Sequence, residues 1–270
     1  MAIRLIALDL DGTLFNSRQQ ISRINQEAVR KTLDSGIQTA IVTGRGRAGA
    51  EMALEMLGLD MPYICSAGSL IHSGRDGYTI SARTFQVQAE LPKIVNFTRR
   101  HNSGLIADTL NRNWWFGPDE LGADLDPMTA AYAWKSQRTY NPEVDFQQPM
   151  LKITLVADHE VLQKAETELC GQCPSLNHVY AGMRYMDLTR HDVNKGSALR
   201  LLSGLYKISP KEVAAIGDQP IDLSMLQFAG LPVAMSNAPG ELKQASRWIA
   251  PSNDEDGVAW TLEKILKEGL

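Results

Sequence analysis

Two carboxylates stand close together near the start of the chain. Asp9 and Asp11 are two residues apart, and Gly12 and Thr13 follow them directly. They come after a mostly apolar run, Ile3–Leu8, that predicts a strand buried on both faces. Such strands belong to parallel sheets, whose ligands bind just beyond the carboxyl ends of the strands. A carboxylate pair at this place, with Gly and Thr after it, favours a cation or phosphoryl site over a helix cap.

Other polar residues follow the ends of further predicted elements. They are Thr43, Lys195, Asp218 and Asp222. Four carboxylates gathered at one sheet edge repel one another and need a cation, and oxygen ligands suit Mg²⁺. Thr43 offers a hydroxyl, and Lys195 offers a point charge for a phosphate oxygen. Asp9 could then attack phosphorus in line to form an aspartyl-phosphate, while Asp11 protonates the leaving oxygen and later activates water.

The elements that must position these residues alternate at the N-terminal end of the chain. Apolar runs at 37–42 and 62–66 predict two more buried strands. A helix precedes the first of them, with Ser22 as its cap and Gly36 at its end. We expect this helix to turn Ile24, together with later apolar residues, toward the core.

The same alternation returns near the C-terminal end. A helix is predicted at 197–205, strands are predicted at 213–216 and 231–235, and a last helix begins at about Val258. Alternating strands and helices predict an α/β fold with a doubly wound parallel sheet of the Rossmann-like kind.

The middle of the chain lacks this alternation. A hairpin is predicted at 70–80, and strands and helices then follow in irregular order. We therefore predict a catalytic core of residues 1–82 and 189–270 with an inserted α+β cap domain of residues 83–188. We expect the cap to close the site, exclude water during transfer and set specificity.

Composition and charge are those of an ordinary globular protein. The 270 residues are 44% hydrophobic and 21% charged, and the net charge of −4 argues against nonspecific nucleic-acid binding. We find no apolar run of roughly 20 residues that would span a membrane. Three cysteines make a disulfide framework improbable. We expect a cytoplasmic monomer or small homo-oligomer with a small-molecule partner, and neither nucleic acid nor membrane as a partner.

The motifs together resemble those of the haloacid dehalogenase superfamily, in particular its Cof-like, subclass IIB sugar-phosphatase-type hydrolases. These enzymes carry a large cap inserted after the second motif. The matching segments occur in family order over nearly the whole chain: Asp9–Leu14, Ile41–Arg45, Asn194–Gly196, Ile216–Asp222, Val233–Ala238 and Asp256–Val258.

The resemblance implies a Mg²⁺-dependent phosphatase for small phosphomonoesters, with sugar phosphates as the expected class. It implies Asp9 as the nucleophile and Asp11 as the acid/base. The implied Mg²⁺ ligands are Asp9, the backbone carbonyl of Asp11, and Asp218. The remaining implied residues are Leu10, Thr43, Gly44 and Lys195 around the phosphate, and Asp222 and Asn237 in support.

Two positions depart from the family pattern. The family usually has Asn directly before the last Asp of its fourth motif, where this chain has Ile221. It also usually has Asn-Gly after the third strand, where this chain has Ala67 and Gly68. Neither change touches the nucleophile, the acid or the main metal carboxylates. We therefore expect the protein to hydrolyse phosphomonoesters. We expect these two changes to affect the rate and the phosphate affinity most.

Other interpretations of the motifs remain open at this point. Residues Gly44–Gly49 match a dinucleotide-binding fingerprint, but the next predicted strand ends near Cys65 without the acidic residue that binds ribose. A receiver domain uses a similar set of side chains, although the chain length and the insertion oppose it. A phosphate-binding regulatory protein without efficient turnover is the third alternative, and Ile221 is its best support.

Two features of the predicted insertion could carry function. Cys170 and Cys173 have redox-motif spacing, but they would close a helix predicted at 161–169, whereas redox pairs open one. Trp114 and Trp115 could stack on a substrate. Because neighbours in a strand point to opposite faces, we expect one ring in the core and the other exposed.

Overall fold

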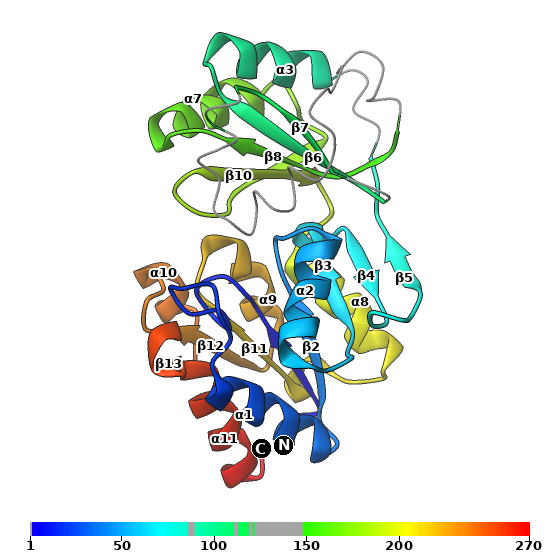
Figure 1. Ribbon diagram of the computed structural model, residues 1–270, viewed down its shortest axis with the longest axis vertical. Coiled ribbons are helices and arrows are strands. Elements are labelled where there is room, and N and C mark those ends of the chain that lie inside the picture. The colour runs from blue at the N-terminus through cyan, green and yellow to red at the C-terminus, as the bar shows by residue number, and fades with distance from the viewer. Residues whose placement is uncertain (1, 86–89, 111–112, 119–120, 122–147) are drawn as a thin grey trace. The chain divides into compact units, whose positions relative to one another are not determined.

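The computed structural model of this protein describes residues 2–85, 90–110, 113–118, 121 and 148–270 (Figure 1). It divides into two compact units. The first consists of Met1–Ile80 and Asn194–Leu270, and the second of Ser81–Val193. Strand β10 (Tyr185–Arg190), which extends past residue 188, belongs to the second unit.

The first unit is built on an eight-stranded sheet with the order β13-β12-β11-β1-β2-β3-β4-β5. Strand β1 lies between β11 and β2 and runs parallel to both. Strand β3 is parallel to β2, but β4 is antiparallel to β3. The sheet is therefore mostly, but not entirely, parallel. The strands are β1 (Leu5–Leu8), β2 (Gln38–Val42), β3 (Tyr63–Cys65), β4 (Leu70–His72), β5 (Thr79–Ala82), β11 (Val213–Gly217), β12 (Leu231–Met235) and β13 (Trp248–Ala250).

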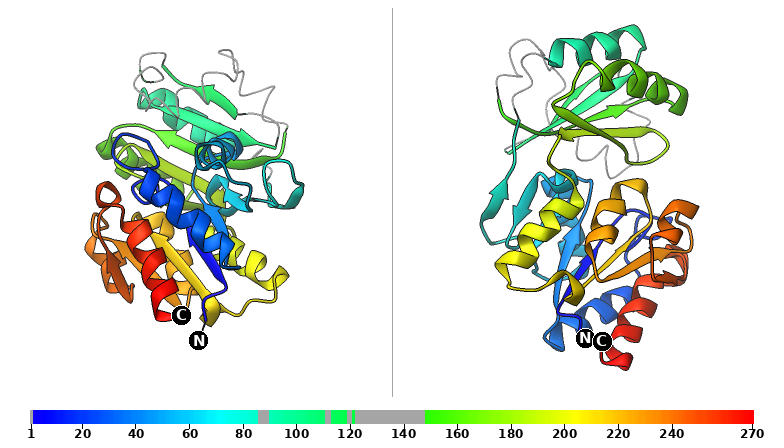
Figure 2. Two further views of the ribbon diagram at one scale, coloured as in Figure 1. Left: turned by 60° about the horizontal axis from the view of Figure 1, so that its bottom comes forward. Right: turned by 180° about the vertical axis from the view of Figure 1, so that it is seen from behind.

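Helices cover both faces of this sheet (Figure 2). Apolar side chains of α8 and α9 join those of the central strands in one buried cluster that includes Leu5, Val42 and Leu199. On the other face, α1 packs beside α11, where the backbone N–H of Ala259 donates to the Asn25 side chain at 2.9 Å. The helices are α1 (Arg23–Asp34), α2 (Arg47–Leu57), α8 (Lys195–Leu205), α9 (Leu223–Phe228), α10 (Gly240–Gln244) and α11 (Gly257–Glu268).

Helix α1 shows how its ends and its buried face are set. The Ser22 side chain caps it by accepting a hydrogen bond from the backbone N–H of Asn25 at 3.0 Å, as predicted. The predicted direction of Ile24 is wrong, since this side chain is 56% exposed. The face toward the core carries Asn25, Ala28, Val29 and Thr32 instead. Two of these residues are polar, and a pattern of apolar residues alone does not predict that they are buried.

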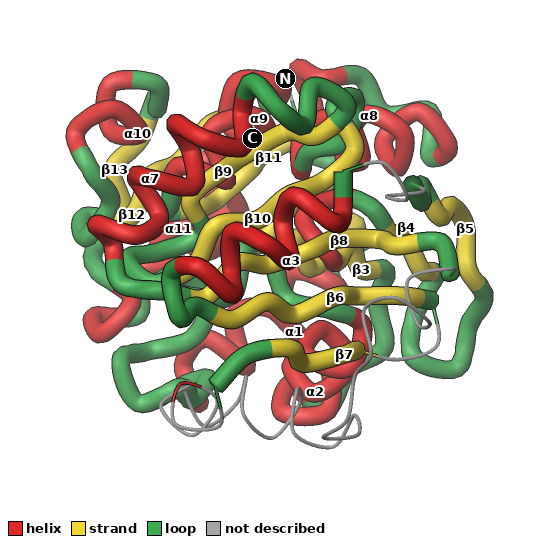
Figure 3. Tube along the Cα trace, turned by 90° about the horizontal axis from the view of Figure 1, so that it is seen from above, coloured by secondary structure: helices red, strands yellow, loops and turns green. Residues whose placement is uncertain are grey.

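The second unit contains a five-stranded sheet with the order β7-β6-β8-β10-β9, in which neighbouring strands run antiparallel. Two helices cross one face of it (Figure 3). Apolar residues of the strands and of both helices form the core of this unit. Among the described residues of this unit, the elements are α3 (Leu91–Arg100), β6 (Gly104–Thr109), β7 (Asn113–Phe116), β8 (Met150–Val156), α7 (His159–Cys170), β9 (Leu176–Tyr180) and β10 (Tyr185–Arg190).

The two tryptophans of β7 are both buried, one on each face of this sheet. Trp114 belongs to the core beneath the helices, whereas Trp115 packs with Ile106 and Val156 on the other face. The expected alternation is therefore present, but the expectation that one ring is exposed is wrong, since Trp115 is only 7% exposed.

The part of the chain that the structure describes contains no helix long and apolar enough to cross a bilayer.

Candidate active site

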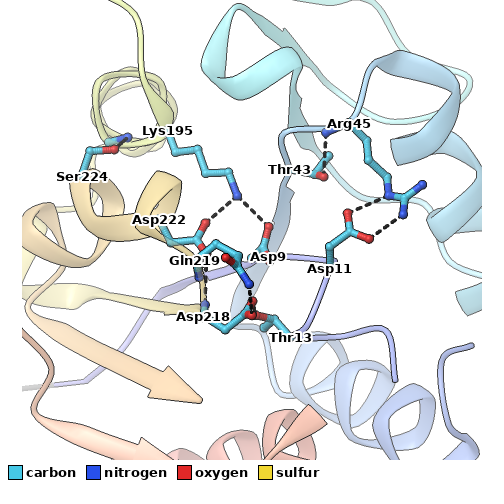
Figure 4. A network of polar contacts seen from close by, with 11 residues as sticks. Asp9, Asp11, Thr13, Thr43, Arg45, Lys195, Asp218, Gln219, Asp222 and Ser224 are labelled. Carbon is cyan, nitrogen blue, oxygen red and sulfur yellow. Dashed lines mark hydrogen bonds and ion pairs between the residues drawn. The ribbon is translucent and has the colours of Figure 1, made fainter. Parts of the chain in front are cut away.

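Three neighbouring parallel strands of the first unit end at one edge of the sheet, and each is followed at once by a polar residue. Asp218 follows β11, Asp9 follows β1, and Thr43 follows β2. All three side chains are buried. Figure 4 shows them facing a common space with Lys195 from the start of α8. The edge is the one at which parallel sheets place their ligands.

Lys195 is the cation of this edge. Its Nζ donates to Asp9 Oδ1 at 2.6 Å and to Asp222 Oδ1 at 2.5 Å, and its side chain is 1% exposed. Burial by itself would lower the pKa of Lys195, but the carboxylates of Asp222 and Asp9 raise it above its ordinary value. Lys195 therefore remains a fixed positive charge at every pH of biological interest.

The start of α8 is held in place by caps and by close packing. The Asn194 side chain accepts from the backbone N–H of Ser197 at 2.8 Å. The backbone N–H of Gly196 donates to Ser224 Oγ at 3.0 Å, and a Cβ at Gly196 would stand 2.2 Å from the Ser224 carbonyl oxygen. A glycine next to Lys195 thus lets α8 approach α9 closely enough to deliver the ammonium group.

Asp222 organises the loop after β11. Its Oδ2 accepts hydrogen bonds from the backbone N–H groups of Asp218 and Gln219 at 3.0 and 2.9 Å, while Oδ1 holds Lys195. It lies directly against Gly217, where a Cβ would be 2.6 Å from its own Cβ. With both oxygens engaged, Asp222 acts as a support for Lys195 and Asp218.

Asp218 is fixed by three neutral donors. Thr13 Oγ1 donates to its Oδ1 at 2.9 Å, and Gln219 Nε2 and Asn237 Nδ2 donate to its Oδ2 at 2.9 and 3.2 Å. Asn237 also donates to the Gly12 carbonyl at 2.9 Å. Burial, followed by the charge of Asp222, nevertheless raises the pKa of Asp218 to about 7.

The carboxylates of Asp9, Asp218 and Asp222 form a buried group whose ligand atoms lie within 4.8 Å of one another. Burial, and then the charge of Asp222, also raise the pKa of Asp9 well above its ordinary value. Three carboxylates thus share one ammonium group, which leaves negative charge uncompensated. An oxygen donor set with this charge fits Mg²⁺.

The Asp11 side chain points the other way, toward Arg45 (Figure 4). Arg45 Nε and Nη2 donate to the two carboxylate oxygens of Asp11 at 2.7 and 2.5 Å. The predicted acid/base is therefore held in a two-pronged ion pair beside the carboxylate group.

The remaining predicted residues lie on the loops after β1 and β2. Thr43 Oγ1 accepts from the backbone N–H of Arg45 at 3.0 Å, and Gly44 stands between these two residues. The Leu10 side chain is fully buried, so only its backbone could serve a phosphate. Ile221 is half-buried at the turn before Asp222.

The structure brings three further residues into this site. Sequence reasoning gave no role to Thr13 or Gln219, and it left Arg45 open between a phosphate contact and a solvent-facing position. Thr13 and Gln219 hold Asp218, and Arg45 holds Asp11. All three stand inside the recognised motifs, so motif position could have indicated them, although residue type alone gives no signal for Gln219.

A family model described as haloacid dehalogenase-like hydrolase matches residues 6–262 of the chain. The 5-amino-6-(5-phospho-D-ribitylamino)uracil phosphatase YwtE of Bacillus subtilis is 31% identical over 98% of this chain and 98% of its own length. The chain belongs to the haloacid dehalogenase-like hydrolase family. The family, the Cof-like resemblance and the class of phosphoric monoester hydrolase predicted from the motifs are thus confirmed.

Solved structures of family members agree with this assignment. A haloacid dehalogenase-like hydrolase from B. subtilis superimposes with a TM-score of 0.84 at 26% identity, over 97% of this chain and 99% of that one. A subclass IIB sugar phosphatase has the same TM-score of 0.84, over 97% and 98% of the two chains. At 20% identity, this similarity supports a shared fold and nothing further. The predicted α/β fold with an α+β insertion is confirmed.

Proposed function

We propose that this haloacid dehalogenase-like hydrolase is a magnesium-dependent phosphatase that hydrolyses small phosphomonoesters through an aspartyl-phosphate on Asp9. One observation carries the proposal. Asp9, at the end of β1, lies in hydrogen-bond contact with Lys195 and within one buried group with Asp218. A carboxylate beside a fixed cation and a divalent-ion site suits attack on a phosphoryl group, whose charge must be neutralised during transfer.

In this proposal Asp9 and Asp218, with the Asp11 carbonyl, would hold Mg²⁺, which would supply charge neutralisation for the phosphoryl oxygens. Lys195 binds a phosphate oxygen, as do Thr43 and the backbone of Gly44 and Leu10. The Asp9 carboxylate forms a bond to phosphorus while the bond from phosphorus to the leaving oxygen breaks.

Proton transfer belongs to Asp11. The leaving oxygen takes a proton from the Asp11 carboxyl as it departs. A water molecule then returns a proton to Asp11 as its oxygen attacks phosphorus, the bond to Asp9 breaks, and inorganic phosphate leaves with Asp9 regenerated.

For the substrate, we propose a phosphorylated sugar or sugar alcohol. The relative that is 31% identical is named for a phosphoribityl compound, which supports a polyol carrying a terminal phosphate. We assign substrate choice to the second unit, Ser81–Val193, in the role of the cap domain.

Phosphate release over a panel of phosphorylated sugars and sugar alcohols tests this function. We expect hydrolysis with added Mg²⁺, loss of activity with EDTA, and recovery when Mg²⁺ is restored. Asp9→Asn should lower turnover by at least about 10⁴-fold, because the amide is a poor nucleophile. Activity that persists in EDTA would remove the metal from the proposal.

The same assay separates the phosphatase from a phosphate-binding regulatory protein, the alternative that Ile221 keeps open. A protein that binds inorganic phosphate in the presence of Mg²⁺ but hydrolyses no member of the panel, and no generic aryl phosphate, would favour the regulatory role.

A further inference from the structure

The Asp11 carboxylate points away from the three carboxylates that lie together at this site. Asp9, Asp218 and Asp222 form the group that could hold a cation, whereas both oxygens of Asp11 accept from Arg45 (Figure 4). Asp11 is still close enough for its charge to raise the pKa of Asp9. Its side chain thus has two possible partners, the cation site on one side and the guanidinium on the other.

Arg45 is itself held in a fixed position. Its side chain is only 12% exposed, its Nη2 also donates to Gln19 Oε1 at 2.9 Å, and its guanidinium lies 5.7 Å from the centre of the Phe15 ring. A Cβ at Gly49 would stand 2.8 Å from the Arg45 Cβ, so only glycine leaves room for this side chain at the start of α2. A guanidinium fixed in this way offers Asp11 a planar fork that a mobile lysine could not.

The chemistry of a divalent site explains why such a fork matters. A carboxylate near Mg²⁺ is attracted to it and becomes a ligand when its oxygens are available, and an ion-bound oxygen cannot carry a proton to a leaving group. An acid/base beside a metal therefore needs a competing partner that holds it out of the coordination sphere.

We propose that Arg45 is a positioning residue that keeps the Asp11 carboxylate out of the cation site and so reserves it for proton transfer. The proposal rests on the proposed phosphatase function. During turnover Asp11 gives up one of its two hydrogen bonds to Arg45. The freed oxygen takes up a proton from solvent and passes it to the leaving oxygen, later receives one from the attacking water and returns it to solvent, while the other oxygen stays on the guanidinium.

Arg45→Gln tests this through two readouts. In calorimetric titration without substrate, the variant should bind Mg²⁺ about threefold to tenfold more tightly, because the released Asp11 adds a ligand charge. In kinetics, kcat/KM for an alkyl phosphate should fall at least about tenfold further than kcat/KM for an aryl phosphate, since an acidic aryl leaving group departs without a proton. The comparison of alkyl and aryl phosphates reports on the step in which the leaving group departs.

Two further variants separate positioning from charge and from folding. Arg47→Gln removes the neighbouring guanidinium, which donates to Glu51 at 2.8 Å, and should change neither readout. Gly49→Ala keeps every charge but displaces Arg45, and should shift both readouts in the direction of Arg45→Gln.

The outcomes are decisive in either direction. Unchanged Mg²⁺ affinity in Arg45→Gln, or an equal loss of kcat/KM for alkyl and aryl phosphates, would overturn the proposal and leave Arg45 a structural residue. Failure of the wild-type protein to hydrolyse either ester would instead refute the proposed function itself.

Discussion

Asp218 illustrates at the level of one residue how burial outweighs hydrogen bonding. Three neutral donors stabilise its ionised form, and yet its pKa rises to about 7 because burial and the charge of Asp222 act against ionisation. Without a metal, Asp218 holds its proton in the folded protein but not in the unfolded chain between about pH 4 and about pH 7. The contribution of this group to the stability of the folded protein should therefore fall as the pH rises through this window, and a divalent cation should restore it.

A pH dependence of metal binding follows. Mg²⁺ must displace the proton of Asp218 below about pH 7, so its affinity should weaken by up to about tenfold for each pH unit from 7 to 6. Calorimetric titration with Mg²⁺ in buffers of different ionisation enthalpy would measure both the affinity and the released proton. A constant affinity from about pH 6 to about pH 8, without proton release, would contradict the assignment of Asp218 as a ligand.

At the level of elements, the turn after β1 connects Asp9 to Asp218, the proposed nucleophile and one of the proposed metal ligands. Gly12 has φ +75°, and a Cβ at this position would stand 2.2 Å from Asp218 Oδ2. Its carbonyl also accepts from Asn237. The glycine therefore meets two requirements, a left-handed backbone and the close approach of the Asp218 side chain, which follows β11.

Gly12→Ala, compared with Gly36→Ala, separates these two needs. Gly36 also has positive φ, +90°, but nothing lies within 4 Å of a Cβ there. Each variant should lose about 1–2 kcal/mol of unfolding free energy in chemical denaturation, because alanine is strained in this conformation. Only Gly12→Ala should also lower Mg²⁺ affinity and activity, since it displaces Asp218. Equal activities in the two variants would contradict the assigned role of this contact.

Local patterns in the sequence were sufficient for most elements of the sheet but not for all details. The strand at 231–235 lies where its apolar run predicts, and β11 extends one residue beyond the predicted 213–216. Short or partly polar elements such as β13 (Trp248–Ala250) and β9 (Leu176–Tyr180) were not predicted, because neither has a long apolar run. The exposure of Ile24 and the burial of Asn25 depend on packing against α11, which no local pattern contains.

For the molecule as a whole, the site is made of residues that are distant in sequence and meet through sheet order. Sequence motifs selected Asp9, Lys195 and Asp218. The neighbouring positions of β11 and β1 bring Asp218 and Asp9 to one edge, where Lys195 reaches Asp9 from the start of α8. Which side chain each would contact was not predictable. The pairing of Asp11 with Arg45 spans 34 residues and depends on the space left by Gly49, which only the folded backbone reveals.

The central claim is that Asp9 accepts the phosphoryl group. Rapid acid quenching during turnover, followed by mass spectrometry of the digested protein, tests it directly. We predict that the peptide containing Asp9 carries the mass of one phosphoryl group, that the label requires Mg²⁺, and that it is absent in Asp9→Asn. Turnover without any label on this peptide, or a label that survives Asp9→Asn, would contradict the account.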